Sequence, residues 1–122
     1  MDSMEPNPEW ERDEDVLAAF AALDDDVVFK IWGADWCPDT RQALPDFAAA
    51  LAAAGVDEDR IRVHEVDRNK DGEGTEEYDV DRIPTIVVER DGEELARFVE
   101  EADVPAATYL AERLGDADTA TV

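Results

Sequence analysis

The residues best suited to chemistry surround Cys37, the only cysteine of the chain. The segment Trp36-Cys37-Pro38-Asp39-Thr40 follows an apolar run and opens a stretch of helical periodicity, which predicts that the thiol lies at a helix N-terminus. Free backbone N–H groups and the helix dipole favour a thiolate at that place, whereas the flanking carboxylates of Asp35 and Asp39 oppose it. We therefore expect a modestly activated thiol; the alternative is a buried, inert cysteine.

Two other features of the sequence carry weaker chemical signals. His64, the only histidine, lies in a predicted strand, which favours a sheet-face residue over a catalytic base. The segment from Asp67 to Gly72 matches the opening of an EF-hand calcium loop, but Tyr78 stands where that loop requires a bidentate Glu. One cysteine and one histidine make a zinc site untenable. We expect neither a metal nor a cofactor.

The charge balance of the chain is strongly acidic. It has 34 acidic against 11 basic residues and a formal net charge of −23. Periodic apolar segments argue against disorder, so the composition favours a halophilic protein over an acidic interaction protein. In molar salt the Debye length falls to about 3 Å, and dense carboxylates repel one another little. The same charge argues against nucleic acid as a partner.

Cysteine usage and the polar N-terminal segment bear on the compartment. A single cysteine excludes a disulfide within the chain, which fits a reducing cytosol or a thiol that acts on partners. Residues 1–10 have no basic n-region and no apolar h-region, so we predict no signal peptide. No apolar run reaches the roughly 18 residues that a membrane span needs. We expect a cytoplasmic protein without a membrane partner.

Apolar periodicity predicts helices that alternate with strands around Cys37. The predicted helices cover residues 13–23, 38–54, about 73–78 and 104–114. The predicted strands cover residues 27–32, 61–66, 85–89 and 94–99, and Asp91-Gly92 closes a hairpin between the last two. This order implies parallel strand pairs with an antiparallel edge, in one α/β domain over residues 10–114. Residues 1–9 and 115–122 are predicted to be flexible acidic ends.

The segment Ala34–Thr40 resembles the Trp-Cys-x-x-Cys active site of thioredoxins, with Thr40 in place of the second cysteine. Three further features resemble that family in order and spacing: Pro45 within the helix, the segment Arg82-Ile83-Pro84-Thr85, and the Asp91-Gly92 hairpin. The resemblance covers roughly residues 13–114. It implies a thioredoxin fold, in which helices cover both faces of a central mixed sheet.

The resemblance also implies a site around Cys37. Ile83 and Pro84 correspond to the family's cis-proline segment, which lies against the active-site sulfur and offers backbone groups to a substrate. Trp36, Pro38 and Asp39 would complete the substrate groove. From the residues alone, a proline before a β-branched run fits a trans proline at the start of a strand equally well.

Two positions depart from the family pattern. Thr40 cannot resolve a mixed disulfide, and Ile31 replaces the buried aspartate that serves the resolving cysteine in thioredoxins. Both losses fit a protein without a two-thiol cycle, because a charged buried carboxylate is costly to hold. The Thr40 hydroxyl either donates a hydrogen bond to the Cys37 sulfur or bonds the backbone as an ordinary first-turn threonine. Thr40 fits a natural single-thiol site or a substitution made to trap a partner.

These features favour a monothiol thioredoxin-like protein. Cys37 would form mixed disulfides with protein or low-molecular-weight thiols and disulfides, and an external thiol would release them. One alternative is a non-enzymatic module that binds an extended peptide near Pro84. Another is a thiol redox sensor that passes through a sulfenic acid.

Overall fold

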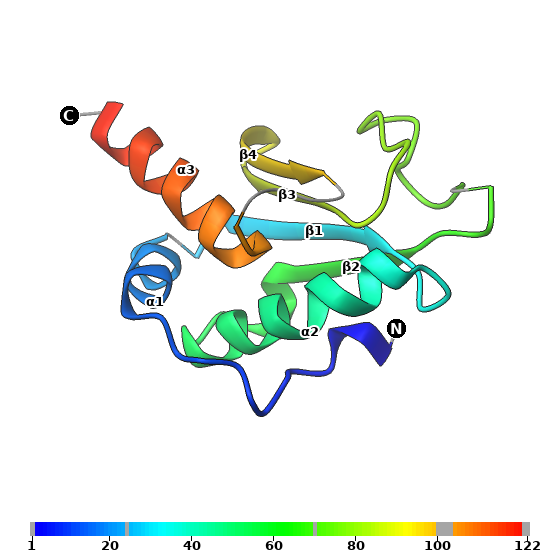
Figure 1. Cartoon of the computed structure of the whole chain (residues 1–122). Helices are drawn as coiled ribbons and strands as arrows, with labels where there is room; N and C mark the ends of the chain where they lie inside the picture. The colour runs from blue at the N-terminus through cyan, green and yellow to red at the C-terminus, as the bar shows by residue number, and fades with distance from the viewer. Residues whose placement is uncertain (1, 24, 70, 100–103, 121–122) are drawn as a thin grey trace.

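Four strands form one mixed sheet in the order β2-β1-β3-β4 (Figure 1). The structure, a computed structural model, describes residues 2–23, 25–69, 71–99 and 104–120. The strands are β1 (Val27–Gly33), β2 (Ile61–Glu65), β3 (Thr85–Arg90) and β4 (Glu93–Val99). The helices are α1 (Glu14–Ala21), α2 (Pro38–Ala53), α3 (Ala106–Ala120) and the short 3-10 helices η1 (Asp2–Met4) and η2 (Glu58–Arg60). The predicted α/β class is confirmed, and no helix among the described residues is long and apolar enough to cross a membrane.

Strand directions match the prediction in part. β1 and β2 are parallel, and the hairpin at Asp91-Gly92, where both residues have positive φ, makes β3 and β4 antiparallel. β3 also runs antiparallel to β1, where alternation with helices had predicted a parallel pair. Since β2 and β3 then run in opposite directions, their connection begins and ends at the same end of the sheet and needs no helix across a face.

The connection from β2 to β3 is not helical where the sequence predicted a helix near residues 73–78. Residues 73–79 form successive turns instead. Gly74 has φ +83° and Asp79 has φ +55°, values that lie outside the right-handed helical region. The left-handed backbone at these two positions interrupts any continuous i to i−4 ladder.

Helix α2 begins at the predicted position because local signals there agree. Cys37 is its N-cap and Pro38 its first residue, where a missing N–H costs nothing. Pro45 lies inside the helix, as predicted. Gly55, with φ +77°, follows the C-terminal cap and ends the helix in the left-handed conformation that favours glycine.

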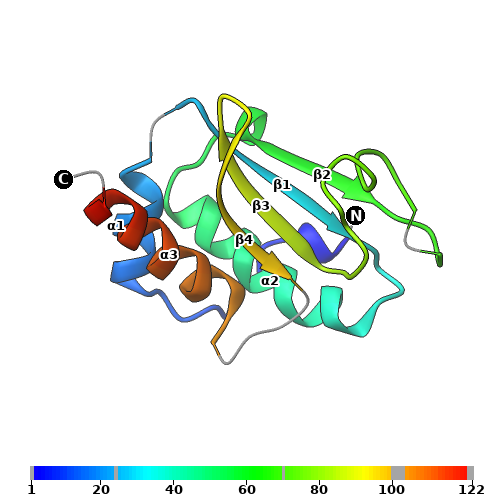
Figure 2. The same cartoon turned by 90° about the horizontal axis from the view of Figure 1, so that it is seen from above.

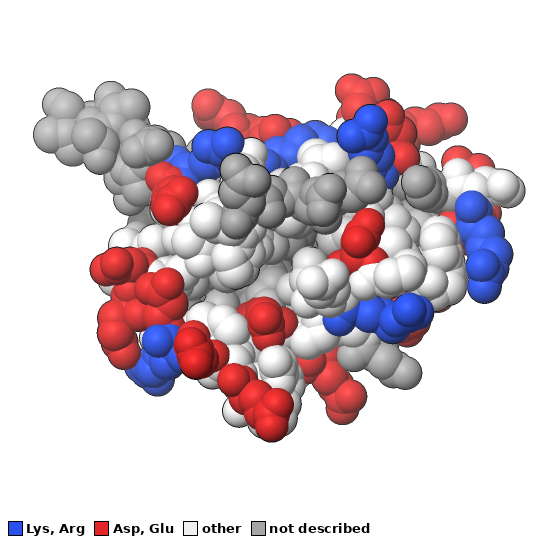
Figure 3. Space-filling view, viewed as in Figure 1, with Lys and Arg blue, Asp and Glu red and all other residues white. Residues whose placement is uncertain are grey.

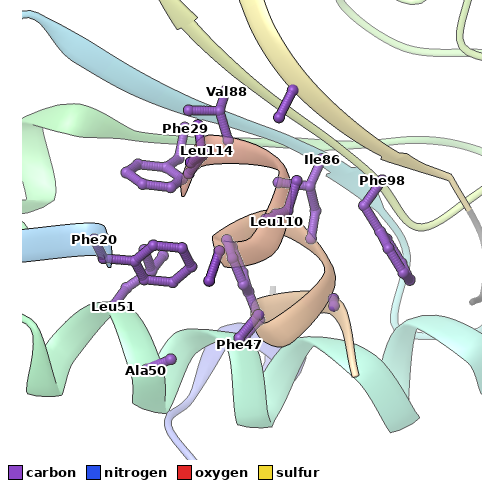
Figure 4. Packing of buried hydrophobic residues seen from close by; sticks show 14 of the residues in the cluster. Phe20, Phe29, Phe47, Ala50, Leu51, Ile86, Val88, Phe98, Leu110 and Leu114 are labelled. Carbon is purple, nitrogen blue, oxygen red and sulfur yellow. The ribbon is translucent and has the colours of Figure 1, made fainter. Parts of the chain in front are cut away.

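One face of the sheet carries the main core. Phe20 of α1, Phe29 of β1 and Phe47 of α2 pack with ring centroids 5.6 to 6.2 Å apart, at tilted or edge-to-face angles. Leu110 and Leu114 of α3 join the same cluster (Figure 4). All three α-helices therefore bury their apolar sides against a single face.

Part of the other face of the sheet is covered by the β2–β3 connection, where the predicted fold placed helices. Because side chains alternate along β1, Phe29 and Ile31 point to the helices while Lys30 and Trp32 point to the opposite face. There Trp32 clusters with Val80 and Ile83 of the connection. Figure 2 shows α2 behind the strands, α1 and α3 beside them, and the connection near the end of β1.

Described contacts and helix bounds extend beyond the predicted domain of residues 10–114 at both ends of the chain. Ser3 is buried and donates from its N–H and its hydroxyl to Asp35 Oδ1, at 3.0 and 2.8 Å. Asn7 N–H donates to the carbonyl of Pro45 in α2, at 3.0 Å. These polar partners tie the start of the chain to α2 and to the loop before it. At the other end, α3 continues past the predicted end at Leu114 to Ala120, since no proline interrupts it.

We expect Phe47→Ala to lower the free energy of unfolding by about 3–5 kcal/mol, because it leaves a cavity among the three rings. Denaturant unfolding at fixed KCl concentration measures this change. The control is Gln42→Ala, at an exposed position of the same helix, which should stay within about 0.5 kcal/mol of wild type. Equal effects of the two substitutions would contradict the packing described.

Candidate functional site

Cys37 lies where the loop after β1 meets α2. Its backbone is extended (φ −89°, ψ 122°), and its N–H donates to the Ala34 carbonyl at 3.0 Å, which closes the loop. The residue is 8% exposed. Its thiol makes a long hydrogen bond to the Ile83 carbonyl, with Sγ and O 3.9 Å apart. The sulfur thus sits between the start of α2 and the segment before β3.

The Ile83-Pro84 segment forms the second wall of the site. Its peptide bond is cis, and both residues are buried. The Thr85 hydroxyl donates to the Arg82 carbonyl at 2.6 Å, which fixes the turn into β3. The structure therefore brings the Ile83 carbonyl to Cys37 from 46 residues away in sequence, and Pro84 follows directly.

Thr40 is fully buried one turn into α2. Its hydroxyl oxygen accepts a hydrogen bond from the Ala34 N–H at 3.4 Å. The side chain also packs closely against Gly33: a Cβ at that glycine would lie 3.0 Å from Thr40 Cγ2. Of the two predicted arrangements, the described contacts show the bond to the backbone. Thr40 supports the loop that carries Cys37.

Trp36 forms the partly buried flank of the site, and two arginines lie beside it. The Arg68 guanidinium carbon is 5.4 Å from the centroid of the Trp36 ring. Arg41 Nη1 donates to the Asp35 carbonyl at 2.8 Å. Pro38 is exposed and Asp39 partly buried in the first turn of α2.

The sequence analysis predicted no role for either arginine, although the strand topology could have indicated the position of Arg68. β1 and β2 are parallel, and the Val66 N–H donates to the Gly33 carbonyl at 3.0 Å. The segments that follow the two strands consequently leave the same edge of the sheet side by side. A residue just after the second strand, such as Arg68, can then reach Trp36.

A polar cluster fastens the β2–β3 connection to the sheet. Lys30 Nζ lies 2.7 Å from Glu89 Oε1, and it also donates to the Tyr78 hydroxyl. Tyr78 in turn donates to the Glu89 carboxylate at 3.0 Å, and its carbonyl accepts from Arg97 Nη1 at 2.8 Å. Residues from β1, β3 and β4 therefore hold one tyrosine of the connection that leads to Ile83.

Aromatic packing adds to this attachment. The centroid of the Trp32 ring lies 5.0 Å from that of the Tyr78 ring, and the His64 ring stacks with Trp32 at 5.1 Å. Its indole N–H donates to the Glu73 carbonyl at 2.8 Å. His64 is thus a sheet-face residue, as predicted.

Two further predicted features have plain structural explanations. Ile31 is fully buried in the core between the sheet and the helices. The cluster around Lys30 lies on the opposite face of the sheet. Its carboxylate therefore does not stand in for the buried aspartate that thioredoxins have at the position of Ile31. Asp67 Oδ1 accepts from the N–H groups of Asn69 and Asp71 at 2.9 and 3.0 Å. That carboxylate closes its own loop; Lys70 of the EF-hand-like segment lies outside the described residues.

Comparison with known proteins gives a family match. A family model described as thioredoxin matches residues 11–111. No curated protein matches the sequence. Among solved structures, Trxlp from Edwardsiella tarda shares 23% identity at a TM-score of 0.54, over 90% of this chain and 96% of that one. A mutant thioredoxin from Halobacterium salinarum shares 22% identity at a TM-score of 0.52, over 94% and 92% of the chains. Thioredoxin from Fasciola hepatica shares 22% identity at a TM-score of 0.52, over 85% of this chain and 89% of that one.

The Lys30 cluster predicts a stability change at high pH. Burial alone would lower the pKa of Lys30, but hydrogen bonds to Glu89 and Tyr78 and the Glu89 charge outweigh it and raise the pKa above its ordinary 10.5. The folded protein therefore holds this proton more tightly than the unfolded chain does. We expect a stabilising contribution that is complete below about pH 10.5 and is lost as the pH rises through the raised pKa.

Denaturant unfolding at a series of pH values should show this loss in wild type and a shallower fall in Lys30→Met. The matched control is Lys70→Met, which removes the only other lysine and should keep the wild-type slope. A Lys30→Met slope equal to that of wild type would show that the pair does not carry the effect.

Proposed function

Since the chain belongs to the thioredoxin family, whose members act in thiol-disulfide redox reactions, we propose that it is a monothiol thioredoxin-like protein. In this proposal Cys37 forms mixed disulfides that an external thiol resolves. One structural observation is the main support for this proposal. The single cysteine caps α2 beside Ile83-Pro84, and the position one turn along the helix holds a buried threonine.

The chemistry needs two exchange steps. In the first, the Cys37 thiolate attacks a disulfide R–S–S–R′, forms a Cys37–S–S–R bond, and releases R′S⁻, which takes up the proton that Cys37 lost. In the second, an external thiolate R″S⁻ attacks the R sulfur and forms R–S–S–R″. The bond to Cys37 breaks, and its thiolate leaves with the electron pair. Cys37 ends in the oxidation state in which it began.

The surrounding residues have distinct roles in this proposal. The α2 N-terminus favours negative charge on the sulfur, through N–H groups that have no partner in the helix. Trp36 and Pro38 flank Cys37 along the chain, and Asp39 lies one residue further in the first turn of α2. Backbone groups at Ile83 and Pro84 would pair with an extended peptide around the attacked disulfide. Thr40 keeps the loop in place and offers no second thiol.

The proposed setting follows from composition. A net charge of −23 supports a halophilic protein, and the lack of a second cysteine fits a reducing cytoplasm. In such a compartment the abundant small thiols would supply the second exchange step. The partners would be disulfide-bearing proteins or low-molecular-weight disulfides.

A non-covalent binding module is the second candidate, and the burial of the thiol favours it. With Cys37 only 8% exposed, the same groove would hold a peptide without exchange. Under this alternative Cys37→Ser would retain a partner peptide in equilibrium binding. Under the monothiol proposal the covalent adduct disappears with that substitution.

The sharpest test restores the missing thiol. With a small symmetrical disulfide as reagent, we expect wild type to accumulate a one-to-one mixed disulfide at Cys37, visible by intact mass. We expect Thr40→Cys to lose this adduct and form a disulfide between Cys37 and the introduced thiol, because the new thiol lies one turn away and attacks intramolecularly.

Thr40→Ser is the matched control, since it keeps a hydroxyl and should retain the adduct like wild type. Absence of any adduct in wild type, while unfolded protein reacts with the same reagent, would contradict the monothiol proposal. A sulfenic acid trapped by dimedone in the absence of disulfide exchange would favour a sensor instead.

A further inference from the structure

We propose that the Cys37 site selects disulfides and thiols that carry a carboxylate, with Arg68 and Arg41 as the residues that determine this specificity. The inference rests on the proposed function and names its substrate class. It runs against the overall charge, because a chain of net charge −23 should repel anionic reagents. Acidic side chains are spread widely over the face in Figure 3, and basic side chains occupy fewer places.

Two guanidinium groups stand beside the residue that precedes Cys37. Arg68 lies over the Trp36 ring at 5.4 Å, and Arg41 donates to the carbonyl of Asp35 at 2.8 Å. Both side chains are exposed. A guanidinium has five N–H donors, so the ring contact and the single carbonyl bond leave most of them able to reach a ligand.

Two carboxylates of the same region each have one oxygen bonded within the protein. Asp35 Oδ1 accepts two hydrogen bonds from Ser3, and Asp67 Oδ1 accepts two from backbone N–H groups of its own loop. Asp39 lies in the first turn of α2, where the helix dipole offsets its charge. In this region two arginines stand against the three aspartates named, a smaller acidic excess than the 34 against 11 of the whole chain.

Guanidinium groups bind carboxylates through paired, charge-assisted hydrogen bonds, which gives directional recognition. A carboxylate a few bonds from the attacked sulfur would meet Arg68 or Arg41 while that sulfur approaches Cys37. A high salt concentration distinguishes this direct contact from the repulsion by the net charge of the chain. In molar KCl the distant carboxylates are screened, while a group in direct contact with a guanidinium is screened less.

The test compares three symmetrical disulfides of similar size: dithiodipropionate (anionic), hydroxyethyl disulfide (neutral) and cystamine (cationic). The rate of adduct formation at Cys37 is followed by intact mass in molar KCl. Each rate is divided by that of the same disulfide with a small free thiol, which removes intrinsic reactivity. We expect wild type to favour the anionic over the cationic reagent by about fivefold, the size expected from two exposed ion pairs.

The double variant Arg68→Gln/Arg41→Gln should lose this preference. The matched control, Arg12→Gln/Arg113→Gln, makes the same charge change at exposed positions on α3 and just before α1 and should retain it. Arg68→Lys keeps the positive charge but lacks the paired N–H donors of a guanidinium, so it should retain part of the preference.

Three results would decide against one proposal or the other. No adduct with any reagent overturns the monothiol function itself. Adducts that form fastest with cystamine overturn the inferred specificity and leave exchange intact. An equal loss of preference in the two double variants also overturns it, because the effect would then be one of total charge.

Discussion

The register between β1 and β3 is the constraint on which the site depends. Trp32 is paired with Thr85 in an antiparallel ladder, so the residues just after β1 and just before β3 leave the sheet together. Cys37 belongs to the first of these segments and Ile83-Pro84 to the second. A shift of one residue would turn every side chain of β3 to the opposite face. It would also separate the thiol from the Ile83 carbonyl.

Different kinds of contact fix this register on the two faces of the sheet. On the helix side it is fixed by apolar packing, since Ile86 and Val88 lie in the same core as Phe29 and Phe47. On the opposite side it is fixed by polar contacts, because Lys30, Tyr78 and Glu89 join neighbouring strands and the connection. An ion pair in this position tolerates few other geometries, and removing one partner would leave a charge in a partly buried place.

The sequence was most informative where the determinants are local. Pro38 at the first helical position and the apolar spacing behind it placed α2 and Cys37, and Asp91-Gly92 placed the hairpin. The sequence was least informative where the local structure depends on an unusual backbone conformation or on contacts between residues far apart in the chain. Nothing local required positive φ at Gly74, so a helix was predicted there. Ser3 lies 32 residues from the aspartate that it bonds, and Arg68 reaches Trp36 only because β2 runs beside β1.

The contact of Ser3 with Asp35 has a practical consequence for handling the protein. The backbone N–H and the hydroxyl of one residue converge on a single carboxylate oxygen, next to Trp36 and two residues before the thiol. An affinity tag or fusion partner joined ahead of Ser3 would lie close to that anchor and to the loop that carries Cys37. Assays of the thiol would then partly report on the tag. A tag joined after α3 leaves the anchor intact and is the sounder choice.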